Sequence, residues 1–129
     1  MSVSLALLLQ AVPVPPPTPP EGEDVVVMAR KLQHWRATIS TDPFGTRCKT
    51  KQSTGDGEID AIGCAAMTQC WPDTLARLRA AHARGVAKPD RARLEQEASD
   101  AFGACSKPKR AAMIDALAAR RAAARESGS

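Results

Sequence analysis

Large aromatic side chains are scarce in this sequence. Its 129 residues include two Trp, two Phe and no Tyr, and alanine supplies much of the 43% hydrophobic content. Alanine removes little apolar area from water, so each buried position contributes less than a Leu or Phe would. The length suits one domain and is short for two of ordinary size. We therefore expect a single domain with a thin core that needs support beyond packing.

The sequence also lacks the common motifs of catalytic and cofactor sites. It contains no Gly-rich phosphate loop, no His-Glu-x-x-His and no Gly-x-Ser-x-Gly. His34 and His82 stand alone. Asp56, Glu58 and Asp60 cluster at an expected helix start, where carboxylates favour the helix dipole. We predict a protein that is not an enzyme and that needs no cofactor or metal.

No apolar run is long enough to cross a bilayer. The run over residues 3–9 is far shorter than the roughly 20 residues of a transmembrane helix. It fits the apolar part of a secretory signal over residues 1–11, with cleavage after Ala11. Two features fit less well: no Lys or Arg precedes the run, and Leu9 stands where a cleavage site usually has a small residue. A misplaced start codon or a simple tail is the alternative. We predict export to the periplasm.

Proline is concentrated near the N-terminus. Proline at the density of residues 13–20 fixes φ and withholds backbone donors. We therefore interpret residues 12–24 as an extended linker. A ligand for an SH3-type domain is the alternative, and it fits an exported chain poorly.

The formal net charge is +4, from 18 basic and 14 acidic residues. Residues 1–24 hold three acids and no Lys or Arg, so the remainder carries 18 − 11 = +7. This balance favours anionic partners. The basic residues are spread along the chain, which favours a solvated surface that binds nothing in particular. An envelope protein or an anionic envelope surface is the partner that the charge would otherwise suit. Nucleic-acid binding is a second alternative, although stacking aromatics and a recognisable binding motif are missing.

The chain has four cysteines, at positions 48, 64, 70 and 105. An even count in a short exported chain with a thin core indicates a disulfide framework, and four cysteines allow three pairings. Structural zinc is the alternative, but Cys-x-x-Cys pairs are absent and the two histidines are isolated.

Alternating and helical patterns predict an α+β fold. Residues 25–29 suit a strand, and residues 35–40 and 47–53 suit a hairpin with a turn at 41–46. A helix over 58–71, capped by Asp56 or Ser53, follows, and Pro72 ends it. The expected large buried side chains are Trp35, Ile39, Ile59, Ile62 and Met67. Breaks near Gly85 and at 107–109 predict further helices over 73–84, 90–103 and 111–125.

The predicted architecture is therefore a small antiparallel sheet of two or three strands with one helix packed on it, followed by two or three Ala-rich helices. Residues 25–71 would form the sheet–helix unit, and residues 72–126 would form a helical extension of the same domain.

Residues 47–67, RCKTKQSTGDGEIDAIGCAAM, resemble part of the C-terminal domain of the TonB family of energy transducers. Variants of that domain carry a strand Cys-x-Val-Thr-x-Ser-Ser-Gly and then a helix opening Leu-Asp-x-x-x-Cys. The matching positions are Cys48, Thr50 (where Val is usual), Ser53, Gly55, Ile59, Asp60 and Cys64. The segment over residues 35–71 is also similar to small periplasmic proteins of sphingomonad-type bacteria. The family's helix is followed by another strand, whereas residues after Pro72 predict helices here.

The resemblance implies a disulfide between Cys48 and Cys64, which would pin the helix to the sheet, and elimination then pairs Cys70 with Cys105. It also implies an alternative function, as a partner in receptor energy transduction. Residues 23–30 are similar to the short segments that receptors present to such transducers, and an internal strand is the other interpretation. The leading prediction remains a non-catalytic, disulfide-stabilised periplasmic protein with an interaction or structural role in the envelope.

Overall fold

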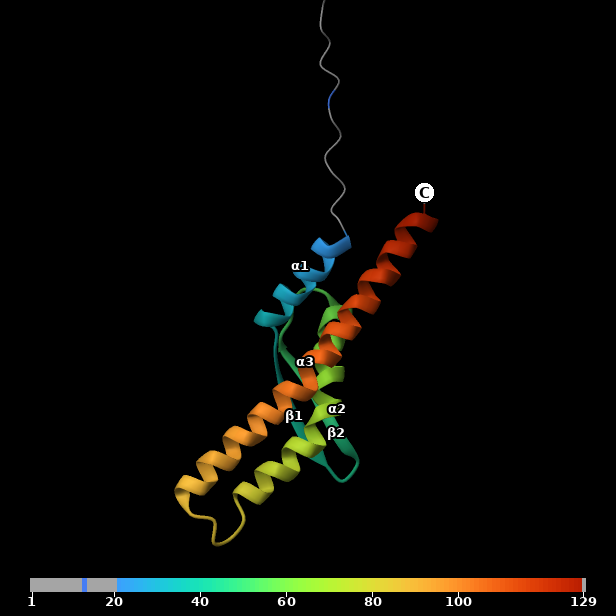
Figure 1. Ribbon diagram of the computed structural model, residues 1–129. Helices are drawn as coiled ribbons and strands as arrows, with labels where there is room; N and C mark the ends of the chain where they lie inside the picture. The colour runs from blue at the N-terminus through green and yellow to red at the C-terminus, as the bar shows by residue number, and fades with distance from the viewer. Residues whose placement is uncertain (1–12, 14–20, 129) are drawn as a thin grey trace, which may run out of the picture.

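The computed structural model describes residue 13 and residues 21–128 (Figure 1). Its elements are α1 (Glu21–His34), β1 (Arg36–Asp42), β2 (Gly45–Gln52), α2 (Gly57–Ala81) and α3 (Lys88–Ser127). The predicted α+β class, with an antiparallel sheet, a helix on it and further helical structure, is confirmed. The predicted signal peptide lies outside the described residues, as does most of the predicted linker. Residues 21–24 of that linker belong to α1.

Residues 25–29 lie in helix α1, so the strand predicted there was wrong. Met28 and Leu32 are buried, whereas Val26 and Val27 are about half exposed at 48% and 47%. The buried positions follow the period of a helix, and burying this face outweighs the modest strand preference of the valine run. Helix α1 therefore covers the core instead of adding a strand to the sheet.

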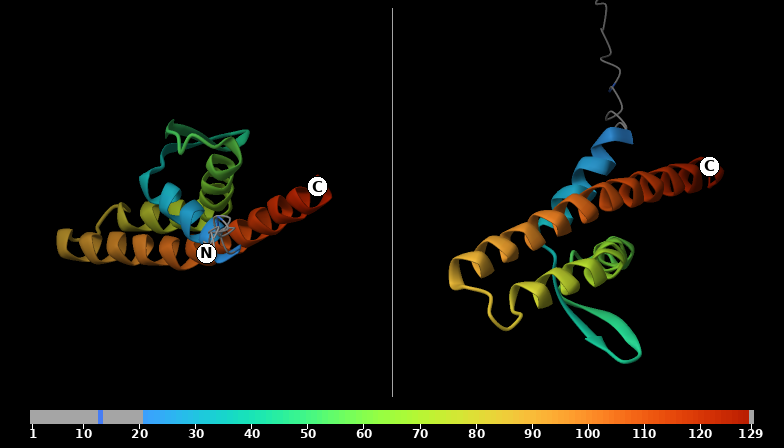
Figure 2. Two further views of the ribbon diagram at one scale, coloured as in Figure 1. Left: turned by 90° about the horizontal axis from the view of Figure 1, so that it is seen from above. Right: turned by 60° about the horizontal axis from the view of Figure 1, so that its bottom comes forward.

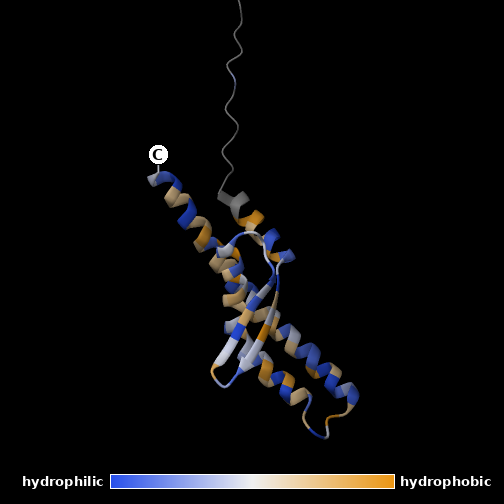
Figure 3. Ribbon diagram, turned by 180° about the vertical axis from the view of Figure 1, so that it is seen from behind, coloured by the Kyte–Doolittle hydropathy of each residue, from blue (hydrophilic) through white to orange (hydrophobic). Residues whose placement is uncertain are grey.

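The predicted hairpin is confirmed, with two antiparallel strands joined at Asp42–Gly45. Ile39 pairs with Cys48, and Ala37 pairs with Thr50. These side chains are partly buried, and their neighbours along each strand are exposed, as alternation about a one-sided sheet requires. Figure 3 shows the alternation of hydrophilic and hydrophobic residues along both strands.

Helix α2 lies between the hairpin and α3, as both views of Figure 2 show. Trp35, Ile59 and Ile62 are buried as predicted, and the predicted core residues Ile39 and Met67 are only partly buried. The buried core cluster consists of Met28, Leu32, Trp35, Ile59, Ile62, Ile114, Leu117 and Ala118. The core therefore draws on α1, α2 and the second half of α3.

Gly63 lets the indole ring of Trp35 lie directly against α2. A Cβ at this position would come within 2.9 Å of three ring atoms, closer than real Cβ contacts. The indole N–H donates to Thr50 Oγ1 at 3.1 Å, which fixes the ring between the helix and β2. The absent side chain of Gly63 therefore sets how closely the hairpin approaches α2.

Two prolines lie inside helices, so the helix breaks predicted at Pro72 and at residues 107–109 were wrong. Pro72 belongs to α2 and Pro108 to α3. Each removes one backbone donor and clashes with the preceding turn, which bends a helix without always ending it. Both helices change direction near their middles (Figures 1 and 2). Pro72 and Pro108 follow Cys70 and Cys105 by two and three residues, so the bends lie beside the disulfide that joins the helices.

Candidate functional site

All four cysteines are paired. Cys48 on β2 is bonded to Cys64 on α2, and Cys70 on α2 is bonded to Cys105 on α3. These are the expected pairs, and they connect the hairpin, α2 and α3 into one covalent frame. In the chain-entropy model, sequence separations of 16 and 35 residues correspond to about 3 and about 4 kcal/mol.

The inner face of the hairpin is fastened to the helices at three places along its length. At the end near α1, the Trp35 ring lies against Gly63 of α2 and donates a hydrogen bond to Thr50 of β2, and the Cys48–Cys64 disulfide holds the middle. Near the turn, the indole N–H of Trp71 on α2 donates to Thr41 Oγ1 at 3.1 Å. The outer face of the hairpin is therefore presented on a rigid support.

Basic side chains gather on that outer face. The exposed outward positions on the two strands include Thr38, Ser40, Asp42, Arg47, Lys49 and Lys51, which we call the hairpin face. Arg47 forms an ion pair with Asp42 at 3.2 Å. Among the residues that the structure describes, Lys49 and Lys51 have no acidic partner.

The hairpin turn carries an aromatic side chain in solvent. Phe44 is 90% exposed, the largest exposure among the large hydrophobic residues of the described chain. Asp42 Oδ1 accepts a hydrogen bond from the Phe44 backbone N–H at 2.8 Å, and Gly45 follows with φ of +133°. Glycine suits this backbone region because side chains are rarely tolerated there. The turn thus leaves Phe44 in solvent at the tip of the hairpin.

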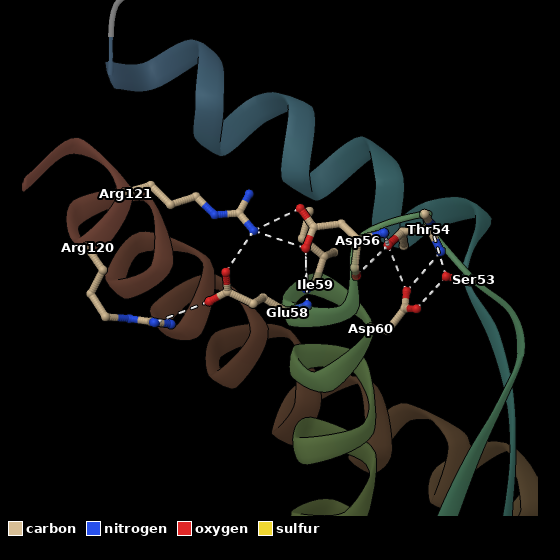
Figure 4. A network of polar contacts seen from close by, with 9 residues as sticks. Ser53, Thr54, Asp56, Glu58, Ile59, Asp60, Arg120 and Arg121 are labelled. Atoms are coloured by element: carbon tan, nitrogen blue, oxygen red, sulfur yellow. Dashed lines mark hydrogen bonds and ion pairs between the residues drawn. The ribbon is translucent and has the colours of Figure 1, made fainter. Parts of the chain in front are cut away.

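A network of polar contacts joins the start of α2 to the second half of α3 (Figure 4). Asp56 caps α2 by accepting the N–H groups of Glu58 and Ile59 at 3.1 and 3.4 Å. Arg121 Nη2 donates to both Asp56 oxygens at 3.0 and 2.8 Å and to Glu58 Oε1 at 3.3 Å. Arg120 Nη1 donates to Glu58 Oε2 at 3.2 Å. These contacts fix the packing of the two helices.

Asp60 closes the connection between β2 and α2. It accepts hydrogen bonds from the Ser53 hydroxyl and from the Thr54 backbone N–H and hydroxyl. The hydrogen bond from Ser53 is the largest influence, and with those from Thr54 it outweighs burial and lowers the pKa of Asp60. All three carboxylates predicted at this helix start, Asp56, Glu58 and Asp60, therefore have structural partners.

The pKa of Asp56 is also lowered. Burial alone would raise it, but the hydrogen bonds from Arg121, Ile59 and Glu58, with the charge of Arg121, together outweigh burial and hold it below the ordinary value of 3.8. The folded state therefore keeps the charge at a pH where the unfolded chain has begun to bind a proton. This stabilisation is complete above the unfolded pKa and is lost as the pH falls through the folded pKa.

Asp56→Asn should isolate the ion pair with Arg121, because Asn caps a helix as well as Asp does. We expect the free energy of unfolding at pH 7 to be about 1 kcal/mol lower in the variant than in the wild type. This deficit should shrink as the pH falls below 3.8 and the wild-type carboxylate takes up a proton. Urea unfolding followed by circular dichroism at pH 7, 5 and 3 measures it.

The matched control is Asp73→Asn, which removes an exposed i,i+4 ion pair with Arg77 on the same helix. It should cost at most about 0.5 kcal/mol. An Asp56→Asn deficit that is constant over the whole pH range would contradict the assigned role of the charge.

Both histidines are exposed. His34 lies at the end of α1, and His82 Nε2 lies 2.8 Å from Glu95 Oε1, so His82 has a partner that sequence reasoning missed. Within the described part of the chain, no group of three or more His, Cys, Asp or Glu residues could hold a metal ion. No helix among the described residues has both the length and the apolar character to span a membrane.

Comparisons with models of protein families, with curated proteins and with solved structures find no match to this chain. The resemblance to the TonB C-terminal domain therefore stays a prediction from the residues of one segment. Over the residues where the family has a further strand, α2 continues as a helix to Ala81.

Proposed function

We propose that this protein is a non-catalytic, disulfide-stabilised binding protein of an oxidising compartment such as the periplasm, and that it contacts an anionic envelope surface through the hairpin face and Phe44. The observation that carries the proposal is the combination of basic side chains without acidic partners and an exposed aromatic on a hairpin fastened at three places.

The disulfides support the choice of compartment. Two disulfides that use every cysteine are typical of proteins that fold outside the reducing cytosol. The core supports it as well, because its only fully buried large side chains among the described residues are Ile59 and Leu117. A core of this kind gains much from covalent support.

The charge and shape of the hairpin support the choice of an anionic lipid surface. Residues 36–52 hold four basic residues and one acid, a local charge of 4 − 1 = +3. Each Lys or Arg held near an anionic membrane contributes about 1 kcal/mol. An aromatic ring gains further free energy by leaving water for the interface of a bilayer. A rigid hairpin offers both without a large ordering cost.

Vesicle binding tests the proposal on the full chain with its disulfides intact. We expect the protein to sediment with vesicles that contain anionic phosphatidylglycerol, and to do so less in high salt because salt screens exposed charges. The double variant Lys49→Gln/Lys51→Gln should weaken binding about tenfold or more, and Phe44→Ser should weaken it severalfold.

The matched control is Arg84→Gln/Lys88→Gln, which removes two exposed charges at the connection between α2 and α3. It should bind vesicles as the wild type does. Equal losses in both double variants would show that only net charge matters and would overturn the assignment to the hairpin. Tighter binding to DNA than to vesicles would favour a nucleic-acid-binding function instead.

The proposed compartment has its own test. Protein expressed in a bacterial host and recovered from the periplasmic fraction should have two disulfides, and mass spectrometry should show processing near Ala11. Recovery from the cytoplasm alone, or four free thiols in exported protein, would refute this part. Specific capture of a TonB-dependent receptor from solubilised envelopes would favour the alternative of energy transduction.

A further inference from the structure

A groove of about 260 Å³ lies between α1 and α3, on elements other than the hairpin. Its floor is apolar, with Leu32 and Ile114 buried beneath it, and its polar lining residues are Gln33, Lys107, Arg110 and Asp115. The other apolar residues that line it are Val25, Ala29 and Ala111. The surface that lines the groove is mainly apolar and is therefore suited to a hydrocarbon chain.

Two basic side chains border this groove, Lys107 and Arg110, with Asp115 as the only acid among the residues that line it. Neither basic side chain has an ion-pair partner among the described residues. The local charge is therefore +2 − 1 = +1, beside an apolar surface.

Arg110 carries a donor that the rest of the chain leaves unsatisfied. Its Nε is buried and has no hydrogen-bond partner in the described structure. Buried polar atoms nearly always have a partner, and an unsatisfied donor on a charged group is costly. Burial also lowers the pKa of Arg110, because the guanidinium is partly withdrawn from water. Because Nε is out of reach of solvent, an anion in the groove would meet the exposed part of this side chain, which lines the groove, and would offset the cost through its charge.

We infer that the groove binds an amphipathic anion, with a single alkyl chain on the apolar floor and a carboxylate on Arg110. A guanidinium presents parallel N–H donors that match a carboxylate, and such charge-assisted bonds are among the strongest hydrogen bonds in proteins. A volume of about 260 Å³ is below the roughly 300–1,000 Å³ that ligand pockets span, so the groove suits one medium-length chain better than a two-chain lipid. This site is separate from the hairpin face and does not depend on its role.

Isothermal titration with decanoate below its micelle concentration tests the inference on the full disulfide-bonded chain. We expect saturable binding at one site, with decyltrimethylammonium and acetate binding at least tenfold more weakly, because the first reverses the charge and the second lacks the chain. Decanoate and a single-chain lysophospholipid should be compared directly, since a free carboxylate and a lipid phosphate share the same anionic chemistry. Tighter binding of the lysophospholipid would overturn the carboxylate assignment.

Two variants and a control distinguish the contribution of the Arg110 charge to binding from that of the apolar floor. Arg110→Gln should weaken decanoate binding at least about tenfold while the protein stays folded, because the lost donor has no partner in the chain. Ala29→Leu fills the groove with no change of charge and should also weaken binding at least about tenfold. Lys109→Gln removes the charge next to Arg110, at a residue that does not line the groove, and should bind as the wild type does.

Failure of the wild type to bind decanoate at millimolar concentration would overturn the inference. Equal affinity of Arg110→Gln and the wild type would overturn it too, as would equal affinity for decyltrimethylammonium. Circular dichroism of each variant confirms that the loss is one of binding and not of folding.

Discussion

Replacing Cys70 and Cys105 with Ser is expected to lower the free energy of unfolding by about 4 kcal/mol, a large share of the stability of a small domain. The bond closes a loop between residues 35 apart in sequence. Beyond it, α2 and α3 run to their connection with only small buried side chains between them, at Thr74, Ala81 and Ala98. The larger apolar side chains of these segments, at Leu75, Leu78, Leu94 and Phe102, are only partly buried, so hydrophobic burial there does not replace the cross-link.

The loss should be local in the folded state. Hydrogen exchange should become faster over residues 71–105, while the hairpin and residues 110–121 stay protected because they belong to the main core. The matched variant, Cys48→Ser/Cys64→Ser, should cost about 3 kcal/mol and loosen the hairpin instead. Uniform acceleration along the whole chain in both variants would contradict this division.

Ile59→Asp should abolish folding. Ile59 is 0% exposed, and the buried cluster around it holds only apolar side chains besides the Trp35 indole N–H, which already donates to Thr50. An Asp side chain there would be either an unpaired buried charge or a protonated acid without a hydrogen-bond partner. The free-energy cost of burying it would exceed the stability of a domain with so thin a core. Far-UV circular dichroism and the dispersion of NMR signals measure the result.

Two further substitutions test whether the burial of the acid, and not the acid itself, prevents folding. Ala61→Asp places the same group at an exposed site two residues along α2 and should fold. Ile59→Val keeps the site apolar and should cost about 1 kcal/mol. A folded, cooperative Ile59→Asp protein would show that the site is not the centre of the core.

The hairpin and the start of α2 could be predicted because their signals are local. Alternation fixed which strand residues face inward, and a carboxylate at Asp56 ahead of an apolar helical period marked the cap. The disulfide pairing followed from the family-like interval and from elimination. The three Val residues of α1 misled because strand preference is weak, and the helical spacing of Met28 and Leu32 was the signal that could have corrected it.

The other differences between the predicted and the observed structure come from contacts between residues far apart in the sequence. Pro72 and Pro108 continue their helices where each is held by a neighbouring disulfide and by packing, and propensity alone cannot anticipate this. Arg121 lies 65 residues from Asp56, so nothing in the sequence connected them. The groove beside Arg110 likewise depends on how distant elements meet, and it was not predicted.

The Cys70–Cys105 disulfide spans the exposed connection between α2 and α3, which includes Arg84 and Gly85. A protease that cuts this connection once adds a water molecule and creates two new chain ends, but the fragments stay joined through the sulfur atoms. The nicked protein keeps the mass of a single molecule until a reductant separates it into two. A cut in this connection therefore releases no fragment, and an electrophoresis gel run without reductant would not reveal the damage.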